Sequence, residues 1–495
     1  MIRTSARTAM SVSLAALLAA PAVTRAHSPH DCPPDLADRP TVGGHLEHAD
    51  IVDGTVSLRR VLAAGEALFV ARFNTCDGQG RPATTGAGER RLPDQPSFVR
   101  TSAPESNSCA GCHADPRPGG SGDIVANVFV LAQALDPVTF SVAPEHSNER
   151  NTPGMFGAGP IELLAREMTR DLQAQAVGLA DGEHVLRTKG IEFEVEMQAG
   201  RVVASRGVDT DLVVRPFHQS GGVVSLREFT VNALNHHHGM QAEERFDLDP
   251  GHDLDPDHDG DGVTRELTVG DVTALTLWQA SLGVPGRVLP ADPRQRAAAR
   301  RGERLFSAIG CDGCHRPALH LDDPVFVEPG PYNPPGTFAD DTHAVAIDLT
   351  RVGEWPRLER SRRGGAVVRA YTDLKRHNLC DPPDMPDAVR HFCNELLDQG
   401  RPAQDGRPGA ELFLTRKLWD AGSSAPYGHR GDLTTLAEAT LAHGGEARAT
   451  RDAFAALGVE DQRAVMDFLR SLQVLPADRR GHRDDHHAEH APRHR

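Results

Sequence analysis

The chain lacks a long hydrophobic run after its first residues, and it is poor in aromatic residues and in net positive charge. A membrane-spanning helix needs about 18 or more consecutive apolar residues, and no segment after residue 26 supplies them, so we expect no membrane span in the mature protein. The net charge of -16 argues against a nucleic-acid partner. A polar, acidic surface explains that charge, which is also compatible with a basic protein partner.

The apolar stretch that does exist lies at the N-terminus. Arg3 and Arg7 precede an alanine-rich run at 9–22, and small residues end it at Ala22 or Ala26. This order is typical of a secretion signal, and the run is too short for a stable membrane span. We expect residues 1–26 to be a signal peptide and the protein to be periplasmic.

Cysteine is also scarce, but four of the 8 cysteines fall into two copies of Cys-x-x-Cys-His. The two copies consist of Cys109, Cys112 and His113, and of Cys311, Cys314 and His315. Two thiols at this spacing lie on one side of a helical turn and can add to the two vinyl groups of one porphyrin, and the histidine binds its iron. A zinc knuckle or a redox Cys-x-x-Cys pair does not require the histidine. The sequence therefore predicts two covalently bound c-type haems.

The other four cysteines are Cys32, Cys76, Cys380 and Cys393. An even number in an oxidising compartment predicts two disulfides, and three pairings are open. We favour Cys380–Cys393, which closes a short loop, and by elimination Cys32–Cys76. Buried free thiols are the alternative.

The sequence of residues 65–69 is echoed at 302–306, just ahead of the second motif. Each copy predicts a helix with an apolar Leu-Phe face that leads into the haem-binding turn. Residues 191–197 alternate strictly between apolar and charged side chains, which predicts a small β-hairpin insertion. We expect a mainly α fold with two tandem cytochrome c-like haem domains, the hairpin lying in the N-terminal one. The expected divisions are a signal peptide at 1–26, domains at 27–290 and 291–475, and a disordered His-rich tail at 476–495.

An acidic loop lies near the end of the expected N-terminal domain. Carboxylates at positions 1, 3 and 5, glycine at 6 and glutamate at 12 match the EF-hand calcium loop, although Gly262 stands where an apolar residue is usual. The predicted Ca²⁺ ligands are Asp255, Asp257, Asp259, Asp261 and Glu266. A solvated acidic loop is the alternative.

Several histidines could serve the haems. Leu436, Thr440 and His443 share one face of a predicted helix, and a buried histidine needs a partner for its nitrogens. Iron is the natural partner for His443, and a backbone carbonyl is the alternative. His146 could cap the distal side of the first haem or lie in a solvated loop, and one of the residues 236–238 could line the same pocket.

The order of these motifs resembles the bacterial di-haem cytochrome c peroxidase superfamily, within its branch of di-haem oxidoreductases of peroxidase or "thiol oxidoreductase" type. The resemblance rests on the paired haem motifs and on residues 150–153, 371–378 and 429–431, and it covers 61–475. It implies an N-terminal haem that reduces hydrogen peroxide and a six-coordinate C-terminal haem that relays electrons from a small cytochrome c or cupredoxin.

The resemblance also implies roles for single residues. In the peroxidases, a methionine fourteen residues after the histidine of the His-x-Gly stretch is the sixth ligand, and counting from His429 leads to His443. An imidazole in place of a thioether should lower the potential of that haem. The resemblance makes Glu162 the candidate pocket acid and Arg150 the group that stabilises charge. Aromatic residues are scarce, at 5%, and Trp278 is the single candidate that we name for an electron relay between the haems.

Two other functions compete with a peroxidase. One is an electron-transfer cytochrome in which both irons are permanently six-coordinate, since 25 histidines are present. The other is a di-haem oxidase or oxygenase that modifies protein side chains or cleaves polyisoprenoids. An enzyme is favoured mainly by the family resemblance.

Overall fold

The computed structural model describes residues 39–79, 106–123, 125–128, 148–246, 263–393 and 411–476. The predicted signal peptide, Cys32, His146, the four calcium-loop aspartates and the His-rich tail beyond 476 lie outside these residues. Within them, no helix is both long enough and apolar enough to cross a membrane.

The described residues form ten α-helices and fourteen strands. The helices are α1 His48–Val52, α2 Leu58–Val70, α3 Ala158–Ala176, α4 Leu226–Ala233, α5 Glu243–Phe246, α6 Val269–Ala280, α7 Pro293–Ala308, α8 Leu436–Leu441, α9 Arg448–Ala455 and α10 Val459–Arg470. The strands are β1 Val125–Val128, β2 Asn148–Asn151, β3 Gly182–Thr188, β4 Ile191–Gln198, β5 Arg201–Arg206, β6 Gly286–Arg287, β7 Leu319–Leu321, β8 Val325–Glu328, β9 Val345–Asp348, β10 Glu359–Arg360, β11 Ala366–Val368, β12 Arg376–Asn378, β13 Leu412–Leu414 and β14 Leu472–Gln473.

The prediction of a mainly α fold is wrong. Helix accounts for 36% of the structure and strand for 16% of it. The described strands pair into six small sheets. Most of these strands span only two to four residues, which is too short for an alternating pattern to show in the sequence. The alternating pattern at 191–197 revealed β4, the longest of the described strands. The expected hairpin is a three-stranded antiparallel sheet, β3-β4-β5, and β4 alternates buried and exposed residues throughout.

The sequence repeat corresponds to two similar helix pairs. Helix α2 packs on α6, and α7 packs on α10. Gly65 lies against the carbonyl of Ala274, and Gly302 lies against that of Ala464, so closely that a Cβ on either glycine would overlap the facing backbone. A helix–helix contact this close needs glycine at the crossing point. The predicted repeat is confirmed by these two pairs.

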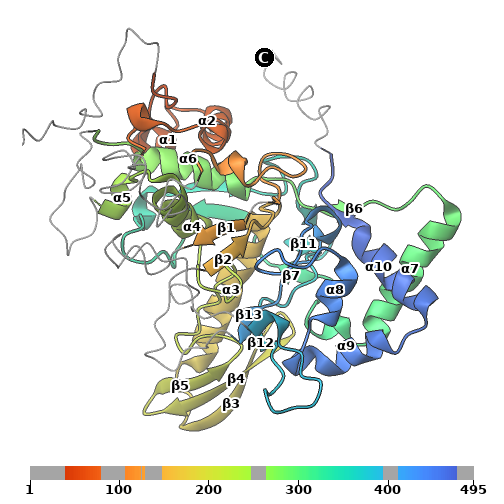
Figure 1. Ribbon diagram of the computed structural model, residues 1–495. Helices are drawn as coiled ribbons and strands as arrows, with labels where there is room; N and C mark the ends of the chain where they lie inside the picture. The colour runs from red at the N-terminus through yellow and green to blue at the C-terminus, as the bar shows by residue number, and fades with distance from the viewer. Residues whose placement is uncertain are drawn as a thin grey trace, which may run out of the picture.

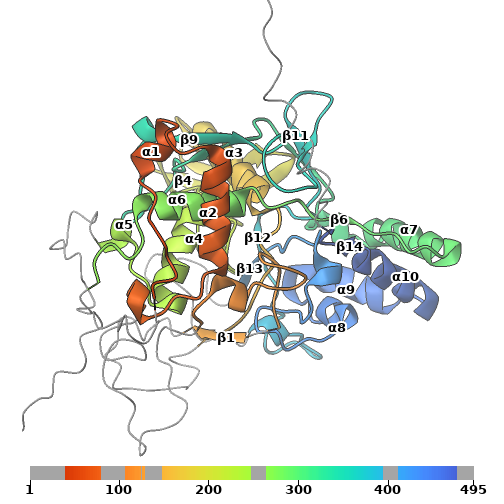
Figure 2. The same cartoon turned by 90° about the horizontal axis from the view of Figure 1, so that it is seen from above.

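The two pairs lie at opposite sides of the molecule. Helices α7 to α10 gather on one side and α1, α2 and α6 on the other, with α3 and the β3-β4-β5 sheet between and below them (Figure 1). Seen from above, α7 and α10 run side by side away from the rest of the chain (Figure 2). Local capping fixes these helices, because Thr268 and Asp271 form a capping box at the start of α6 and Asp292 caps α7 ahead of Pro293.

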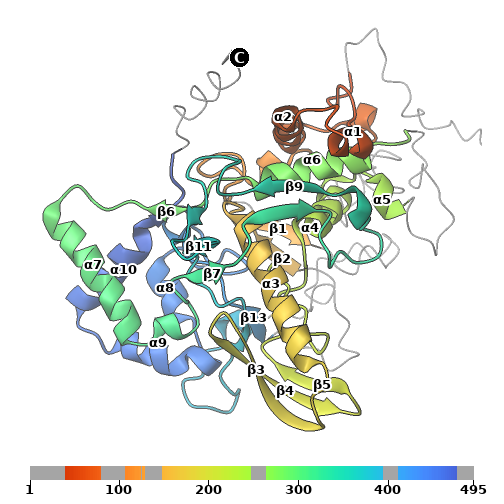
Figure 3. The same ribbon diagram turned by 180° about the vertical axis from the view of Figure 1, so that it is seen from behind.

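The predicted domain boundary at 290/291 falls inside a shared core. Strands β8 and β9 follow the boundary in sequence, yet they lie beside α4 and α6 of the N-terminal part (Figure 3). One hydrophobic cluster contains Leu164 and Leu277 together with Phe326 and Ile347. The division into two domains stays a prediction.

The disulfide between Cys380 and Cys393 is confirmed. Cys76 is also disulfide-bonded, and its predicted partner Cys32 lies outside the described residues.

Candidate di-haem site

The first haem motif forms a single turn of 3₁₀ helix at Cys109–Gly111. The thiols of Cys109 and Cys112 are not in a disulfide. The Nδ1–H of His113 donates to the carbonyl of Pro153 at 3.0 Å, which fixes the ring and leaves Nε2 for an iron. The Phe69 ring lies 6.2 Å from the His113 ring, with 52° between their planes.

The second motif repeats this geometry. It forms a 3₁₀ turn at Cys311–Gly313, its thiols are not in a disulfide, and Nδ1–H of His315 donates to the carbonyl of Tyr371 at 3.0 Å. The ring of Phe306 lies 6.2 Å from that of His315, again with 52° between the planes. Two copies of one arrangement argue for one shared chemistry.

Both motif histidines are held in the neutral form that binds iron. The pKa of His113 is lowered to about 4, mainly by burial and in smaller part by His237 and Lys417. Burial also lowers the pKa of His315 to about 4, and His443 is the second cause. A neutral imidazole with Nδ1–H bound to a carbonyl is the form that a haem iron accepts.

His443 is brought close to His315. It follows α8, and its Nδ1–H donates to the carbonyl of Ala439 at 2.8 Å, in the same manner as the motif histidines. Burial lowers its pKa. The alternative partner predicted for His443, a backbone carbonyl, is therefore present at Nδ1. Its Nε2 makes no hydrogen bond to the described residues. Iron ligation through Nε2 stays a prediction that this geometry permits.

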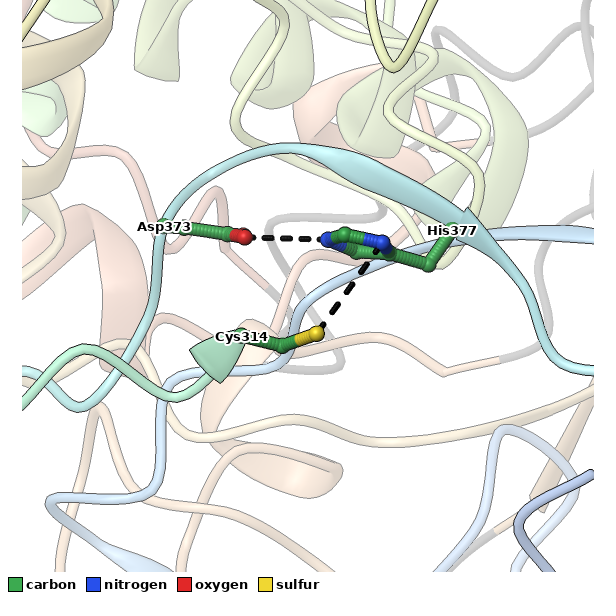
Figure 4. A group of neighbouring side chains, drawn as sticks. All are labelled: Cys314, Asp373 and His377. Carbon is green, nitrogen blue, oxygen red and sulfur yellow. Dashed lines mark hydrogen bonds and ion pairs between the residues drawn. The ribbon is translucent and has the colours of Figure 1, made fainter. Parts of the chain in front are cut away.

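A charged cluster borders the second motif (Figure 4). His377 bonds through Nε2 to Asp373 at 2.9 Å and through Nδ1 to Glu446 at 2.8 Å, and Cys314 Sγ lies 4.0 Å from Nδ1. Burial opposes the charged ring, but the bonds to Asp373, Cys314 and Glu446 raise the pKa of His377 to about 11. His377 is thus an imidazolium ion beside a haem-attachment cysteine.

The atoms of Cys314, Asp373 and His377 lie within 4.8 Å of one another, as a metal site would require. However, both ring nitrogens of His377 are already engaged with carboxylates, and the thiol belongs to the haem motif. We therefore assign this cluster to the second haem site rather than to a separate metal.

Two further histidines lie beside the first motif. Residues Leu234–His238 form a π-helical segment, and its last residue, His238, accepts from the thiol of Cys109 at 3.3 Å while its Nδ1–H donates to Ser106. The charge of His237 acts on His113. The sequence indicated only that one histidine of residues 236–238 could line this pocket. The π-helical turn decides where the side chains of His237 and His238 point, and such a turn leaves no simple pattern in a sequence.

The predicted catalytic acid Glu162 lies fully buried in α3. Its carboxylate accepts from the side chain of Arg166 and from the backbone N–H of Leu226 at 2.7 Å. Burial raises the pKa of Glu162, although Arg166 opposes the shift. The predicted charge-stabilising residue, Arg150, lies in β2, where it pairs with Ala126 of β1. Their catalytic roles stay predictions.

Glu162 belongs to a buried ion network that the sequence did not indicate. Arg227 is 0% exposed and bonds to Glu244 at 2.6 Å and to Glu328 at 2.9 Å. Arg166 lies 4.0 Å from Glu328, which joins the two halves of the network. The network therefore ties α3, α4 and β8 together.

Two other predicted residues have defined places. Glu266 is buried and accepts from the backbone N–H and the side-chain amide of Gln241, at 2.7 and 2.9 Å. Calcium ligation by Glu266 stays a prediction, because its four partner aspartates lie outside the described residues. Trp278 packs on Phe69 with 4.6 Å between ring centroids, next to the first motif.

These arrangements fit haem at both motifs. Each motif offers two thiols outside disulfides, a fixed neutral histidine and an apolar surround, with Phe156, Leu234 and Trp278 around the first and Phe306 and Phe468 around the second. Such a surround keeps water from the porphyrin and helps to set its potential.

One comparison, with known protein families, agrees with this assignment. Residues 374–472 match the family described as "Di-haem oxidoreductase, putative peroxidase". No curated protein matches the chain.

Two solved structures are similar in part. A hydrazine synthase from Kuenenia stuttgartiensis is 12% identical, covers 87% of this chain and 94% of its own, and has a TM-score of 0.36. A MauG-like protein associated with microbial copper homeostasis is 14% identical, covers 65% of this chain and 88% of its own, and has a TM-score of 0.25. At these TM-scores neither likeness bears on the function of this chain. The segment that is similar to the di-haem oxidoreductases, residues 374–472, holds His377, Glu446 and His443.

Proposed function

We propose that the chain is a periplasmic di-haem oxidoreductase that reduces hydrogen peroxide at its N-terminal haem and takes in electrons at its C-terminal haem. Haem is attached through Cys109 and Cys112 at the first site and through Cys311 and Cys314 at the second. When bound, the haems supply the iron that exchanges electrons with the substrate and with the donor. A small cytochrome c or cupredoxin is the proposed donor.

The observation that carries the proposal lies at the second site. His443 is a second neutral imidazole, and it lies close enough to His315 to lower the pKa of that residue. Both rings keep Nε2 for a metal. An iron with two such ligands has no position for peroxide and suits electron relay. Chemistry on a small oxidant is then left to the first site.

Residues of the chain supply the protons in this proposal. Burial raises the pKa of Glu162, and a raised pKa suits a carboxyl group that transfers a proton. Glu162 would move that proton between the two peroxide oxygens, and Arg150 would stabilise the charge that develops. Calcium would bind in the loop 255–266, with Glu266 as its last ligand, and would complete the set of cofactors together with the two haems.

An EPR spectrum of the oxidised protein tests the proposal. A high-spin ferric signal from one haem, together with peroxide turnover, is the expected result. Two low-spin signals that persist after calcium and one reducing equivalent are added would exclude a peroxidase.

A specific observation favours a second candidate, an electron carrier. Haem attachment at Cys109 removes the thiol proton that His238 Nε2 now accepts, so this imidazole becomes available as a ligand. If it binds the first iron permanently, the spectrum shows two low-spin haems. His238→Ala would then convert one of them to high spin, whereas in the peroxidase it would leave the open iron open.

A further inference from the structure

A buried ion pair from the C-terminal part of the chain lies against the first haem site. Lys417 follows β13 and Asp420 follows Lys417, and their side chains are 10% and 3% exposed. Lys417 Nζ donates to Asp420 Oδ2 at 3.1 Å and to the carbonyl of Gly154 at 2.8 Å. Asp420 also lies against Gly154, because a Cβ there would meet Oδ2 at 2.7 Å.

The pair acts on the segment that holds the proximal histidine. The carbonyl of Pro153 accepts from His113, and the next carbonyl, that of Gly154, accepts from Lys417. Two consecutive peptide groups thus join the histidine to a lysine that lies 304 positions later, counted as 417 minus 113. The charge of Lys417 reaches His113, where it lowers the pKa after burial and His237.

Charges at such a position alter a redox centre. Reduction of a ferric haem removes one positive charge, so a buried cation nearby favours the reduced state and a buried anion favours the oxidised state. Low exposure keeps both effects from being screened by solvent. Lys417 and Asp420 therefore push the potential in opposite directions.

We propose that Lys417 and Asp420 set the reduction potential of the N-terminal haem from the C-terminal part of the chain. The inference rests on the proposed attachment of haem at Cys109 and Cys112. Lys417 and Asp420 are positioning residues here, since they act through Gly154, Pro153 and their own charge. Because their charges have opposite signs, replacing them should shift the potential in opposite directions. Two residues with a merely structural role would not show this difference.

The test is a spectroelectrochemical titration of the holoprotein and five variants, one of which is a control. Lys417→Met should lower the potential of the N-terminal haem, Asp420→Asn should raise it, and the double variant should return towards the wild-type value. We expect each single change to alter the equilibrium constant for reduction at least tenfold, which is 59 mV for one electron. Lys417→Arg keeps the charge and should keep the potential.

Arg416→Met is the matched control. Arg416 is the neighbouring cation and lies 3.8 Å from the same Asp420, but it is 48% exposed. Its loss should leave the potential of the N-terminal haem within a few millivolts of the wild type, because solvent screens its charge.

The outcomes separate the inference from the function on which it rests. A shift of the same sign in Lys417→Met and Asp420→Asn, or no shift in either, overturns the inference. If Lys417→Met does not fold, Asp420→Asn decides alone, since a lowered or unchanged potential overturns the proposal. A pyridine haemochrome assay that finds equal haem content in the wild type and in the variant with Cys109→Ala and Cys112→Ala shows that no haem is attached there. That result overturns the proposed function and this inference with it.

Discussion

Gly302 of α7 lies directly against the backbone carbonyl of Ala464 in α10, with no room for a side chain between them. The contact closes the helix pair beside the second haem motif, because Phe306, one turn after Gly302, packs on both His315 and Phe468. The spacing of two helices therefore decides where a haem ligand sits.

Gly302→Ala should separate α7 from α10. The added methyl group overlaps the carbonyl of Ala464, so we expect a loss of about 1 to 3 kcal/mol in the free energy of unfolding. Denaturant unfolding followed by circular dichroism measures it. Gly44→Ala is the control, since nothing lies within 4 Å of a Cβ at that position. Equal stability of the two variants would contradict the close contact.

His377→Gln should destabilise the C-terminal part of the protein. The change removes an imidazolium ion and leaves the buried carboxylate of Asp373 and that of Glu446 without it. Breaking a buried pair by removing one partner costs about 3 to 5 kcal/mol. We expect the lower part of that range, because the Glu446 side chain is 29% exposed. His320→Gln, at a side chain that is 43% exposed, should have little effect.

The same cluster predicts a pH dependence. The folded pKa of His377 is raised to about 11, so its contribution to stability is complete below its unfolded value of 6.5 and is lost as pH rises towards 11. The folded pKa of Glu446 is lowered to about 2, although burial opposes this and the bond to His377 causes it. Its contribution is complete above 4.5 and is lost as pH falls towards 2.

The cluster should therefore stabilise the protein most between pH 4.5 and 6.5. The difference in unfolding free energy between the wild type and His377→Gln, measured from pH 4 to 10, should be largest in that window and shrink on the alkaline side. A difference that grows above pH 7 would show that His377 is not an imidazolium ion.

Arg227→Met should weaken the buried network. It leaves Glu244 and Glu328 without their shared cation, at a cost of about 3 to 5 kcal/mol. Thermal unfolding of the holoprotein measures the effect. The control is Arg463→Met, because the pair that Arg463 forms with Glu460 is exposed and contributes little. If both variants unfold alike, the network does not hold β8 in place.

His443→Ala should open the second iron. If His443 is its sixth ligand, the low-spin ferric EPR signal of the C-terminal haem is replaced by a high-spin signal. His443→Met, which supplies a thioether, should restore the low-spin state at a higher potential. His184→Ala, at a histidine of β3 that bonds to the carbonyl of Ala180, should leave both signals unchanged. An unchanged spectrum of His443→Ala would remove His443 from the ligand set.

The sequence predicted those parts of the site that local spacing encodes. The motif cysteines and histidines, the repeat around Phe69 and Phe306, and the proximity of His443 to His315 follow from patterns of fewer than twenty residues or from a motif count. It did not predict the bond from Lys417 to Gly154 or the pairing of Arg227 with Glu328, because nothing local marks contacts that are 263 and 101 positions apart.

The prediction of the fold class was wrong for a related reason. A strand such as β6 or β10 spans two residues and is made by its partner, β14 or β11, rather than by its own alternation. Helices, whose hydrogen bonds are local, were easier to find than these strands. The expected proportion of helix was therefore too high.

Glu328, buried beside Arg227 and Arg166, has a consequence for how the chain is made. Ribosomes complete the first 290 residues before they reach the strands β8 and β9 that close the same core. Until Glu328 arrives, Arg227 has only Glu244 as its acidic partner, and the apolar surface that Phe326 and Ile347 will cover stays open. The core around Leu164 and Leu277 is therefore completed only when the second half of the chain is present.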